Sequence, residues 1–278
     1  MSVPSLLNEI ELLTTLVGCP SVSGEEDTIA RLTEDIVRGW GLDVVRDDTG
    51  VKVVVETGRP GRNLAFISHL DVVPPGEGWT RDPFKPTIEG RLLYGRGSGD
   101  AKASVAAMLL AARDFAEERD SEVGGSLIVI LGLGEETRNT SMGRAVATVP
   151  PINATVVGEP TNLAIANAQR GLMMVDLVAR GDQRHAGYAA DGGFTNAITA
   201  LAADLVKLPG LLADRLHPIL GRTTVTATMV QAGVSRNVTP PSAKAVLDIR
   251  STPSWEHDEI AEAMKAALDS EVIVTSDR

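Results

Sequence analysis

The sequence predicts an α/β protein of two domains, and three features of the residue pattern indicate this. Short apolar runs with the length of strands alternate with longer segments whose apolar residues recur at helical spacing. One run, Leu127 to Leu131, is continuously apolar, which is typical of a central strand buried on both faces. After Glu159 the alternation changes, and 278 residues exceed one average domain. We therefore place a mostly parallel-sheet domain at 1–170 and a smaller two-layer α/β domain at 171–278.

The first predicted domain opens with helices. Apolar residues at helical spacing predict a helix that ends before Pro20, through Leu6, Leu7, Ile10, Leu13, Leu16 and Val17. Acidic residues in the first turn and Gly41 after the end predict a second helix over 25–40. Runs of β-forming residues at 42–45 and 51–56 flank a turn sequence and predict a hairpin. The apolar run at 63–67 predicts the next strand.

A histidine and an aspartate follow that strand. Because residues two apart on an extended chain point the same way, His69 can face a metal while Asp71 holds its imidazole in one tautomer. A histidine and an aspartate that cap a strand in water are the alternative, and a single pair leaves this alternative open. A metal site therefore requires further acidic residues at comparable strand ends.

Asp100 occupies a second candidate position. The segment 74–90 is rich in proline and glycine and predicts an ordered loop, and a glycine-rich stretch at 95–99 then leads into a strongly helical segment at 101–118. Asp100 thus stands at a helix start, where an N-cap is the usual role of aspartate. The glycine spacing is not that of a phosphate loop, and a carboxylate would repel the anion, so we exclude a phosphate site.

Three glutamates follow two further predicted strands. Glu135 and Glu136 come after the strand at 125–134, and Glu159 comes after the strand at 154–157. Adjacent side chains point in different directions, so one of the paired glutamates can bind a metal while the other accepts a proton. Two solvated loop glutamates are the alternative. Parallel α/β sheets gather functional residues at the carboxyl ends of their strands, so we expect all these groups to converge as N and O ligands for zinc, cobalt or manganese.

The second predicted domain has a different order of elements. Its strands are predicted at 171–180, 222–232, 243–250 and 271–275, and its helices at 196–208 and 255–268. Two helices set against four strands indicate a separate two-layer α/β domain.

Composition bounds the partners and the compartment. With 26 Lys and Arg against 37 Asp and Glu, the net charge of −11 argues against a nucleic-acid partner and suits a protein that gathers cations. The single cysteine, Cys19, excludes an intrachain disulfide and a thiolate cluster and fits a reducing compartment. The sequence has no apolar run of membrane-spanning length, and residues 1–9 lack the features of a signal peptide. We expect a cytoplasmic protein with no membrane partner.

Four segments of the chain resemble the metal-dependent amidohydrolases of peptidase family M20: SHLDVVPPGEGW, YGRGSGDAKA, LGEETRNTSMG and VVGEPT. The similarity is to the branch of acetylornithine deacetylase and succinyl-diaminopimelate desuccinylase, and the segments follow the family's order. It implies a zinc-peptidase-like catalytic domain followed by a lid domain that forms a homodimer. The implied substrate is a small N-acyl amino acid, whose amide bond is hydrolysed.

The resemblance implies roles for the residues at the predicted strand ends. His69 and Glu159 would bind one zinc or cobalt ion, Asp100 would bridge two ions, and Glu136 would bind the second. Glu135 would be the general base, which takes a proton from water between the metals and returns it to the leaving amine.

The remaining implied roles lie around that centre. Asp71 would orient the metal-binding histidine. In the lid domain, His185 would help to stabilise the oxyanion across the dimer, although Arg184 stands where a small residue usually precedes that histidine. Asn237 and Arg250 would hold the carboxylate of the substrate. Without the family, a surface histidine and an arginine in an ordinary salt bridge are the preferred interpretations.

The family also implies a C-terminal segment that returns from the lid to the catalytic domain with a last metal-binding histidine. The sequence ends at Arg278 and no histidine follows His257, so we expect the second metal site to lack this ligand. We accordingly expect the chain alone to be weakly active or inactive. The sequence is then either a fragment or a shortened relative. A non-catalytic remnant that binds metal and dimerises is the competing interpretation: the missing segment argues for it, and the intact Glu135 argues against it.

Substrate choice depends on the residues before Arg170. A desuccinylase is expected to carry basic residues there, whereas residues 166–169 are Ala, Asn, Ala and Gln. This favours a short acyl group, so we predict an enzyme like acetylornithine deacetylase, which belongs to amino-acid and specifically arginine biosynthesis. A succinyl-diaminopimelate desuccinylase or a related aminoacylase or peptidase is the alternative.

Overall fold

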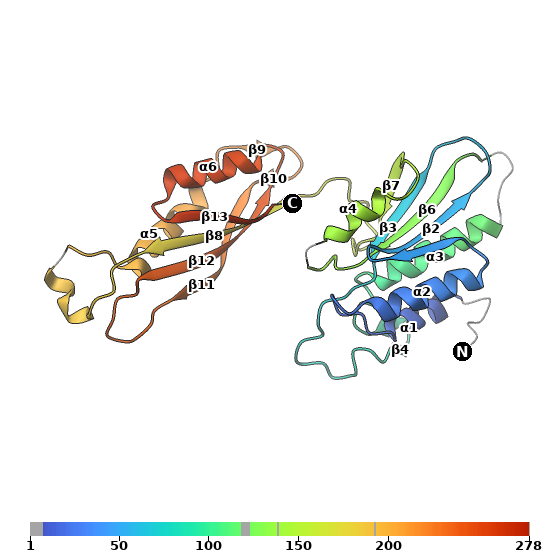
Figure 1. Cartoon of the computed structure of the whole chain (residues 1–278), viewed down its shortest axis with the longest axis horizontal. Coiled ribbons are helices and arrows are strands. Elements are labelled where there is room, and N and C mark those ends of the chain that lie inside the picture. The colour runs from blue at the N-terminus through green and yellow to red at the C-terminus, as the bar shows by residue number, and fades with distance from the viewer. Residues whose placement is uncertain (1–7, 118–122, 138, 192, 278) are drawn as a thin grey trace. The chain divides into compact units, whose positions relative to one another are not determined.

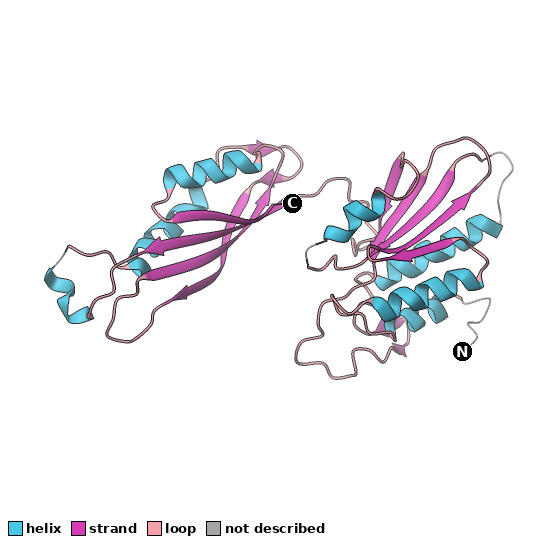
Figure 2. Ribbon diagram, viewed as in Figure 1, coloured by secondary structure: helices cyan, strands magenta, loops and turns pink. Residues whose placement is uncertain are grey.

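The protein is described here from a computed structural model, which covers residues 8–117, 123–137, 139–191 and 193–277 (Figure 1). The chain divides into two compact units, unit 1 at Met1–Ala164 and unit 2 at Ile165–Arg278. Each unit combines helices with a sheet (Figure 2), so the predicted α/β class is confirmed. The predicted domain boundary after residue 170 falls at the start of the first strand of unit 2, β8 (Gly171–Arg180). The predicted helical positions Leu6, Leu7 and Glu118 lie outside the described residues.

Unit 1 is built on a five-stranded sheet with the order β1-β2-β6-β3-β7. The strands are β1 (Val44–Asp47), β2 (Gly50–Glu56), β3 (Leu64–His69), β6 (Ser126–Gly132) and β7 (Ala154–Val157). The three strands β6, β3 and β7 run parallel, whereas β1 and β2 form the predicted antiparallel hairpin, which joins the sheet through β6. The carboxyl ends of the parallel strands therefore lie at one edge of the sheet, as the predicted site requires.

Helices cover both faces of this sheet (Figure 1). On one face, α1 (Glu9–Val17), α2 (Asp27–Gly39) and α3 (Lys102–Glu117) pack against alternate strand residues that include Leu127, Val129 and Leu131 of β6. On the other face, α4 (Thr140–Val146) packs against Ile128 and Ile130. Burial on both faces explains the continuous apolar run in this strand.

Three short elements of unit 1 were not predicted. They are α4 and the hairpin of β4 (Thr87–Glu89) and β5 (Leu92–Tyr94). Gly143 inside α4 weakens its helical signal, and the hairpin lies at the end of a segment rich in proline and glycine. Tertiary packing decides α4, since its Ala145 is fully buried.

Unit 2 has a four-stranded antiparallel sheet with the order β11-β12-β8-β13. Its elements are β8, α5 (Ala197–Lys207), β11 (Thr224–Ala232), β12 (Ser242–Ser251), α6 (His257–Ala267) and β13 (Glu271–Asp277), with two-residue strands β9 (Leu216–His217) and β10 (Gly221–Arg222) and the 3-10 turns Ala186–Asp191 and Leu208–Gly210. The main elements follow the βαββαβ order of ferredoxin-like domains. Both helices pack on one face, where alternate residues of β8 and β12 are buried.

A buried carboxylate joins the two helices of unit 2. Asp204 of α5 is fully buried and accepts hydrogen bonds from the backbone amides of Asp269 (3.1 Å) and Ser270 (2.8 Å), which follow α6. The Lys207 ammonium also donates to it, at 2.9 Å. Burial raises the pKa of Asp204, but these hydrogen bonds outweigh burial and lower the pKa to about 2.

We expect Asp204→Ala to lower the free energy of unfolding of unit 2 by about 3 kcal/mol at pH 7, because two backbone amides, one of them buried, lose their acceptor and the Lys207 ammonium loses one of its acceptors. The folded pKa lies below the ordinary value of 3.8, so this contribution is complete above that value and is lost as the pH falls toward about 2. Urea unfolding at pH 7, 4 and 3 measures it. Asp269→Asn is the control, and an equal loss in both variants would contradict the assignment.

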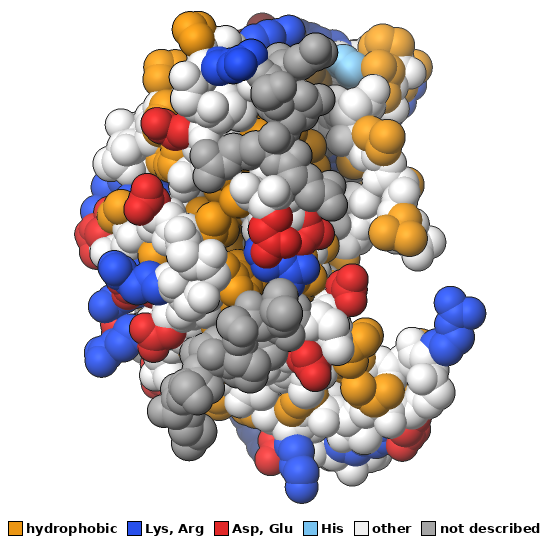
Figure 3. All heavy atoms as spheres, turned by 90° about the vertical axis from the view of Figure 1, so that its right-hand side faces the viewer, with side chains coloured by type: hydrophobic (Ala, Val, Ile, Leu, Met, Phe, Trp, Pro, Cys, Tyr) orange, Lys and Arg blue, Asp and Glu red, His pale blue; other side chains and the backbone are white. Residues whose placement is uncertain are grey.

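The described surface carries charges of both signs. Figure 3 shows one face of the molecule, on which acidic and basic side chains are interspersed. None of the helices in the described ranges combines the length and apolar character needed to cross a membrane.

Candidate metal centre

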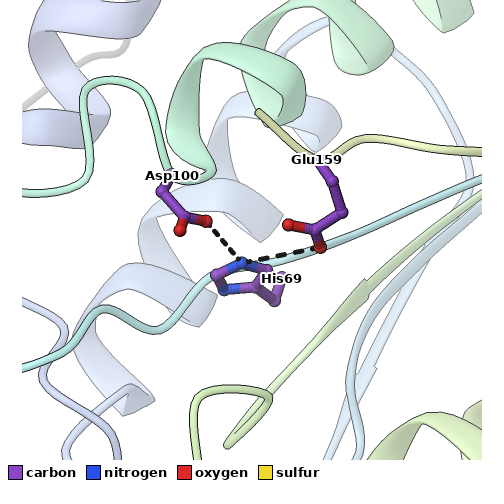
Figure 4. A group of neighbouring side chains, drawn as sticks. All are labelled: His69, Asp100 and Glu159. Atoms are coloured by element: carbon purple, nitrogen blue, oxygen red, sulfur yellow. Dashed lines mark hydrogen bonds and ion pairs between the residues drawn. The ribbon is translucent and has the colours of Figure 1, made fainter. Parts of the chain in front are cut away.

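Three potential metal ligands meet at the edge of the sheet in unit 1 (Figure 4). His69 is the last residue of β3, Glu159 follows β7, and Asp100 lies in the loop before α3. The imidazole Nε2 of His69 lies 3.3 Å from Asp100 Oδ1 and 3.9 Å from Glu159 Oε1. Within the described residues, these three form the one group of three or more His, Cys, Asp or Glu whose ligand atoms all lie within 4.8 Å of one another. The structure thus brings together three of the four predicted metal ligands.

The parallel register places the strand-end ligands side by side. The amide of Gly158 donates to the carbonyl of Ile67 at 2.8 Å, which continues the pairing of β3 with β7. The hydroxyl of Ser68 donates to the carbonyl of Gly158 at 3.0 Å. These two bonds hold the backbone next to Glu159 against the strand that carries His69.

Asp100 is held by the start of α3. The amide of Lys102 donates to the carbonyl of Gly97, and its buried ammonium donates to the carbonyls of Leu16 (3.0 Å) and Cys19 (2.8 Å) at the end of α1. Burial lowers the pKa of this ammonium to about 8. The loop that carries Asp100 is thereby fixed to α1, and the Asp100 side chain meets His69 at the metal centre.

The His69 imidazole is oriented with one nitrogen toward the carboxylates. Its side chain is only 1% exposed, and Nδ1 lies 3.0 Å from the backbone carbonyl of Asp71. In the neutral imidazole, a proton on Nδ1 would donate to that carbonyl, and the lone pair of Nε2 would face Asp100 and Glu159, as a metal ligand must. Burial lowers the pKa of His69, but the hydrogen bond and charge of Asp71 and the charges of Glu159 and Glu135 outweigh it and raise the pKa to about 9.

The site concentrates negative charge. Burial raises the pKa of Glu159, and the neighbouring carboxylates of Asp100, Glu135 and Glu136 raise it further, whereas His69 lowers it. Burial and the charge of Asp100 likewise raise the pKa of Glu136. Carboxylates that repel one another gain free energy when a cation lies among them. One imidazole nitrogen and two carboxylates therefore fit a divalent ion that accepts N and O ligands.

The predicted base and the fourth predicted ligand lie on a turn after β6. Glu135 and Glu136 are half-buried, and Glu136 lies outside the group of three ligands defined above. The side-chain amide of Asn139 donates to Glu135 Oε1 at 3.2 Å. The backbone amides of both glutamates donate to the carboxylate of Asp71, each at 3.0 Å. This carboxylate thus contacts the turn as well as the imidazole.

The predicted lid residues lie in unit 2. His185 and Asn237 belong to neighbouring segments, because the amide of Ala186 donates to the carbonyl of Asn237 at 2.8 Å. The side chains of His185 and Asn237 are both exposed. The amide of Gly187 donates to His185 Nδ1 at 3.0 Å. Arg250 projects from β12 and forms a two-pronged ion pair with Asp248, at 2.8 and 3.1 Å. The predicted carboxylate-binding guanidinium therefore already has one carboxylate partner.

The two remaining histidines, which matched no family position, have local partners in unit 2. His217 Nδ1 accepts from the amides of two residues that follow it in the turn before β10. His257 lies between Ser251, whose Oγ is 2.6 Å from Nε2, and Asp277, which contacts Nδ1. These contacts join the ends of β12, α6 and β13.

Sequence reasoning missed the residues that support the centre from a distance. Ser23 donates to the Asp71 carboxylate at 2.8 Å, and Glu26 accepts from the amide of Gly134 at 3.0 Å. Both precede or begin α2, far along the chain from the turn that they help to hold. Asn139 lies within a segment quoted for the family resemblance, so its sequence signal was present but had no assigned role.

Comparison with known proteins gives consistent matches. The sequence model of peptidase family M20/M25/M40 matches residues 65–274. Succinyl-diaminopimelate desuccinylase 2 from Ruegeria sp. (strain TM1040) is 34% identical over 267 residues, which cover 90% of this chain and 66% of that protein. A succinyl-diaminopimelate desuccinylase from Cereibacter sphaeroides (strain ATCC 17029 / ATH 2.4.9) is 32% identical over 281 residues, with 92% and 73% covered. The chain thus spans about two thirds of the length of the Ruegeria protein.

A solved structure matches the fold across both units. The M20 family metallo-carboxypeptidase from Sulfolobus solfataricus gives a TM-score of 0.76 at 18% identity, and the match covers 97% of this chain and 78% of that chain. At this level of identity the likeness establishes a shared fold. The matched family and the matched fold agree with the α/β metallohydrolase architecture predicted from the sequence.

Proposed function

The chain belongs to peptidase family M20/M25/M40, and from this membership we propose that it hydrolyses the amide bond of an N-acyl amino acid with the help of divalent metal. One observation carries the proposal: His69, Asp100 and Glu159 bring their ligand atoms within 4.8 Å of one another at the sheet edge. A paired glutamate turn stands beside them, which supplies a candidate base. A metal-dependent hydrolase needs both parts.

We assign the residues as follows. His69, Asp100 and Glu159 would hold one ion, and Glu136 would join Asp100 at a second. Lewis-acid polarisation of the amide carbonyl and activation of water are the chemistry that zinc or cobalt supplies in such a site. Glu135 would take the proton of the attacking water and deliver it to the amine nitrogen as the amide bond breaks. Asn139 donates to Glu135 Oε1 and limits the directions in which this carboxylate can point.

For three residues of unit 2 we propose the roles that the family resemblance implies. His185 would donate a hydrogen bond to the oxyanion that forms at the amide carbon. Asn237 and Arg250 would bind the carboxylate of the amino-acid product. Arg250 uses two of its donors on Asp248, and a guanidinium carries five, so a second carboxylate can still be bound. A homodimer formed through unit 2 and a cytoplasmic location stay predictions from the sequence.

Different observations support a succinyl and an acetyl group as the acyl group of the substrate. The Ruegeria and Cereibacter relatives are named as succinyl-diaminopimelate desuccinylases, and this favours an N-succinyl substrate. The absence of basic residues at 166–169 favours the N-acetyl substrate of an acetylornithine deacetylase. Arg170 is not fully available to bind the succinyl carboxylate in place of those basic residues, because its guanidinium donates to the carbonyl of Leu220 at 2.8 and 3.1 Å. We propose the N-succinyl amino acid first and the N-acetyl amino acid second.

A matched substrate panel separates the two. We expect kcat/KM for N-succinyl-diaminopimelate and other N-succinyl amino acids to exceed that for N-acetylornithine by about tenfold or more in the presence of zinc or cobalt, since a recognised carboxylate contributes roughly 1.4 kcal/mol or more. Release of the free amine is the measurement, and chelator-treated protein is the control. A preference for N-acetyl substrates would support the second candidate, and equal release with and without metal would contradict the metal-dependent hydrolase itself.

A further inference from the structure

The Asp71 carboxylate is placed to do more than orient the neighbouring histidine. It is fully buried, and its oxygens accept from three donors on two distant segments. Oδ1 accepts from the amide of Glu135 at 3.0 Å, and Oδ2 accepts from the amide of Glu136 at 3.0 Å and from the hydroxyl of Ser23 at 2.8 Å. The two carboxylate oxygens thus hold two consecutive amides of one turn.

The His69 imidazole lies closer to the backbone carbonyl of Asp71 than to the Asp71 carboxylate. His69 Nδ1 lies 3.0 Å from the backbone carbonyl of Asp71 and 3.4 Å from its Oδ1. A backbone carbonyl is present whatever side chain follows it, so the tautomer of His69 does not depend on the carboxylate alone. The carboxylate, by contrast, makes its shorter hydrogen bonds to the glutamate turn.

The register of the sheet explains why the two segments meet. Strands β3 and β6 are parallel, and His69 pairs with Gly132. The amide of Leu70 then donates to the carbonyl of Gly132 at 2.9 Å, which extends the pairing past the end of the sheet. Asp71 therefore lies beside the turn at Glu135 and Glu136, whose amides donate to its carboxylate.

We propose that Asp71 is a positioning residue for the glutamate turn: its carboxylate fixes the backbone of the base Glu135 and of the ligand Glu136 relative to His69. The proposal rests on the proposed function for the roles of the two glutamates. Its structural content, that one carboxylate holds both amides, is independent of catalysis. A single buried group would then set the distance between the metal ligands and the base.

The chemistry requires a carboxylate at this position. An ionised aspartate accepts hydrogen bonds at both oxygens, whereas asparagine has one acceptor oxygen and one NH2 group. In Asp71→Asn the NH2 group replaces either Oδ1, which faces the amide of Glu135, or Oδ2, which faces the amide of Glu136 and the hydroxyl of Ser23. The isosteric change therefore removes the acceptor for at least one amide of the turn while the volume of the side chain is kept.

The test compares Asp71→Asn with Ser23→Ala, which removes one donor to the carboxylate and leaves both amides their acceptor. Hydrogen exchange of assigned backbone amides is measured by NMR without substrate or metal. We expect exchange at Glu135 or Glu136 to accelerate at least about tenfold in Asp71→Asn, the ratio expected for one lost charge-assisted hydrogen bond, and less in Ser23→Ala. Exchange at Ile130 in the centre of β6 should stay unchanged.

Two results would overturn the proposal: unchanged exchange at both glutamates, or equal acceleration at Ile130. Should Asp71→Asn fail to fold, the wild-type protein gives the answer, because exchange of both glutamate amides at the rate of an unstructured chain contradicts the hydrogen bonds. Zinc titration adds a second readout, with affinity expected to fall about 10- to 100-fold in Asp71→Asn. If the wild-type protein binds no metal and releases no amine, the proposed function fails, and exchange still decides this proposal.

Discussion

Replacement of Glu135 by glutamine is expected to lower kcat for amide hydrolysis by about a hundredfold to ten-thousandfold, the range that a general base contributes. Glutamine keeps the shape of the side chain and can still accept from the Asn139 amide, which donates to Glu135 Oε1 at 3.2 Å. It cannot take a proton from water. The backbone amide that donates to Asp71 is unaffected by the change.

Metal binding separates this effect from loss of the site. Glu135 is not one of the three residues whose ligand atoms lie within 4.8 Å, so Glu135→Gln should bind zinc with unchanged stoichiometry in an isothermal titration. Glu262→Gln is the matched control, because Glu262 is exposed on α6 and pairs with Lys265. If Glu135→Gln retained more than a tenth of the wild-type kcat, Glu135 would not be the base.

The second large effect is expected at the histidine. His69→Ala should weaken zinc binding by more than about a hundredfold, because it removes the nitrogen ligand and leaves Asp100 and Glu159 to repel each other. Activity should fall with the metal. Equilibrium dialysis with zinc, followed by metal analysis of the protein, measures the stoichiometry and the affinity.

The control for this variant is His217→Gln. His217 accepts hydrogen bonds from the amides of Ile219 and Leu220 in unit 2, and it is not one of the three ligands of the metal centre. It should bind zinc as the wild-type protein does. Wild-type zinc affinity in His69→Ala would show that the group of three ligands is not the metal site.

Much of the fold could be read from local pattern. The continuous run of Leu127 to Leu131 predicted a strand buried on both faces, and Leu127 and Ile128 do face opposite layers of helix. Strands were also predicted at 171–180 and 243–250, where β8 and β12 lie with alternate residues buried. Such patterns are visible in a sequence because strand and helix repeat their buried positions at fixed periods. The helix α4 escaped prediction because its seven residues, with a glycine among them, give too weak a periodic signal.

The ligands of the metal centre could be predicted from the sequence, but the residues that support them could not. His69, Asp100 and Glu159 were each found from their positions at strand ends or a helix start. The neighbouring parallel strands bring His69 and Glu159 together, and the loop before α3 adds Asp100. Their supporting residues gave no such signal. Lys102 reaches the carbonyls of Leu16 and Cys19 across more than eighty residues of sequence, and no local pattern marks such a pairing.

The sequence by itself determined the α/β class, the family and the set of residue types that can hold a divalent ion, because these depend on short motifs and on periodic burial. Tertiary structure alone decided how the parts are held. The parallel register that pairs His69 with Gly132 brings the Asp71 carboxylate beside the amides of Glu135 and Glu136. That contact joins residues more than sixty positions apart, so it exists only once both strands lie in one sheet.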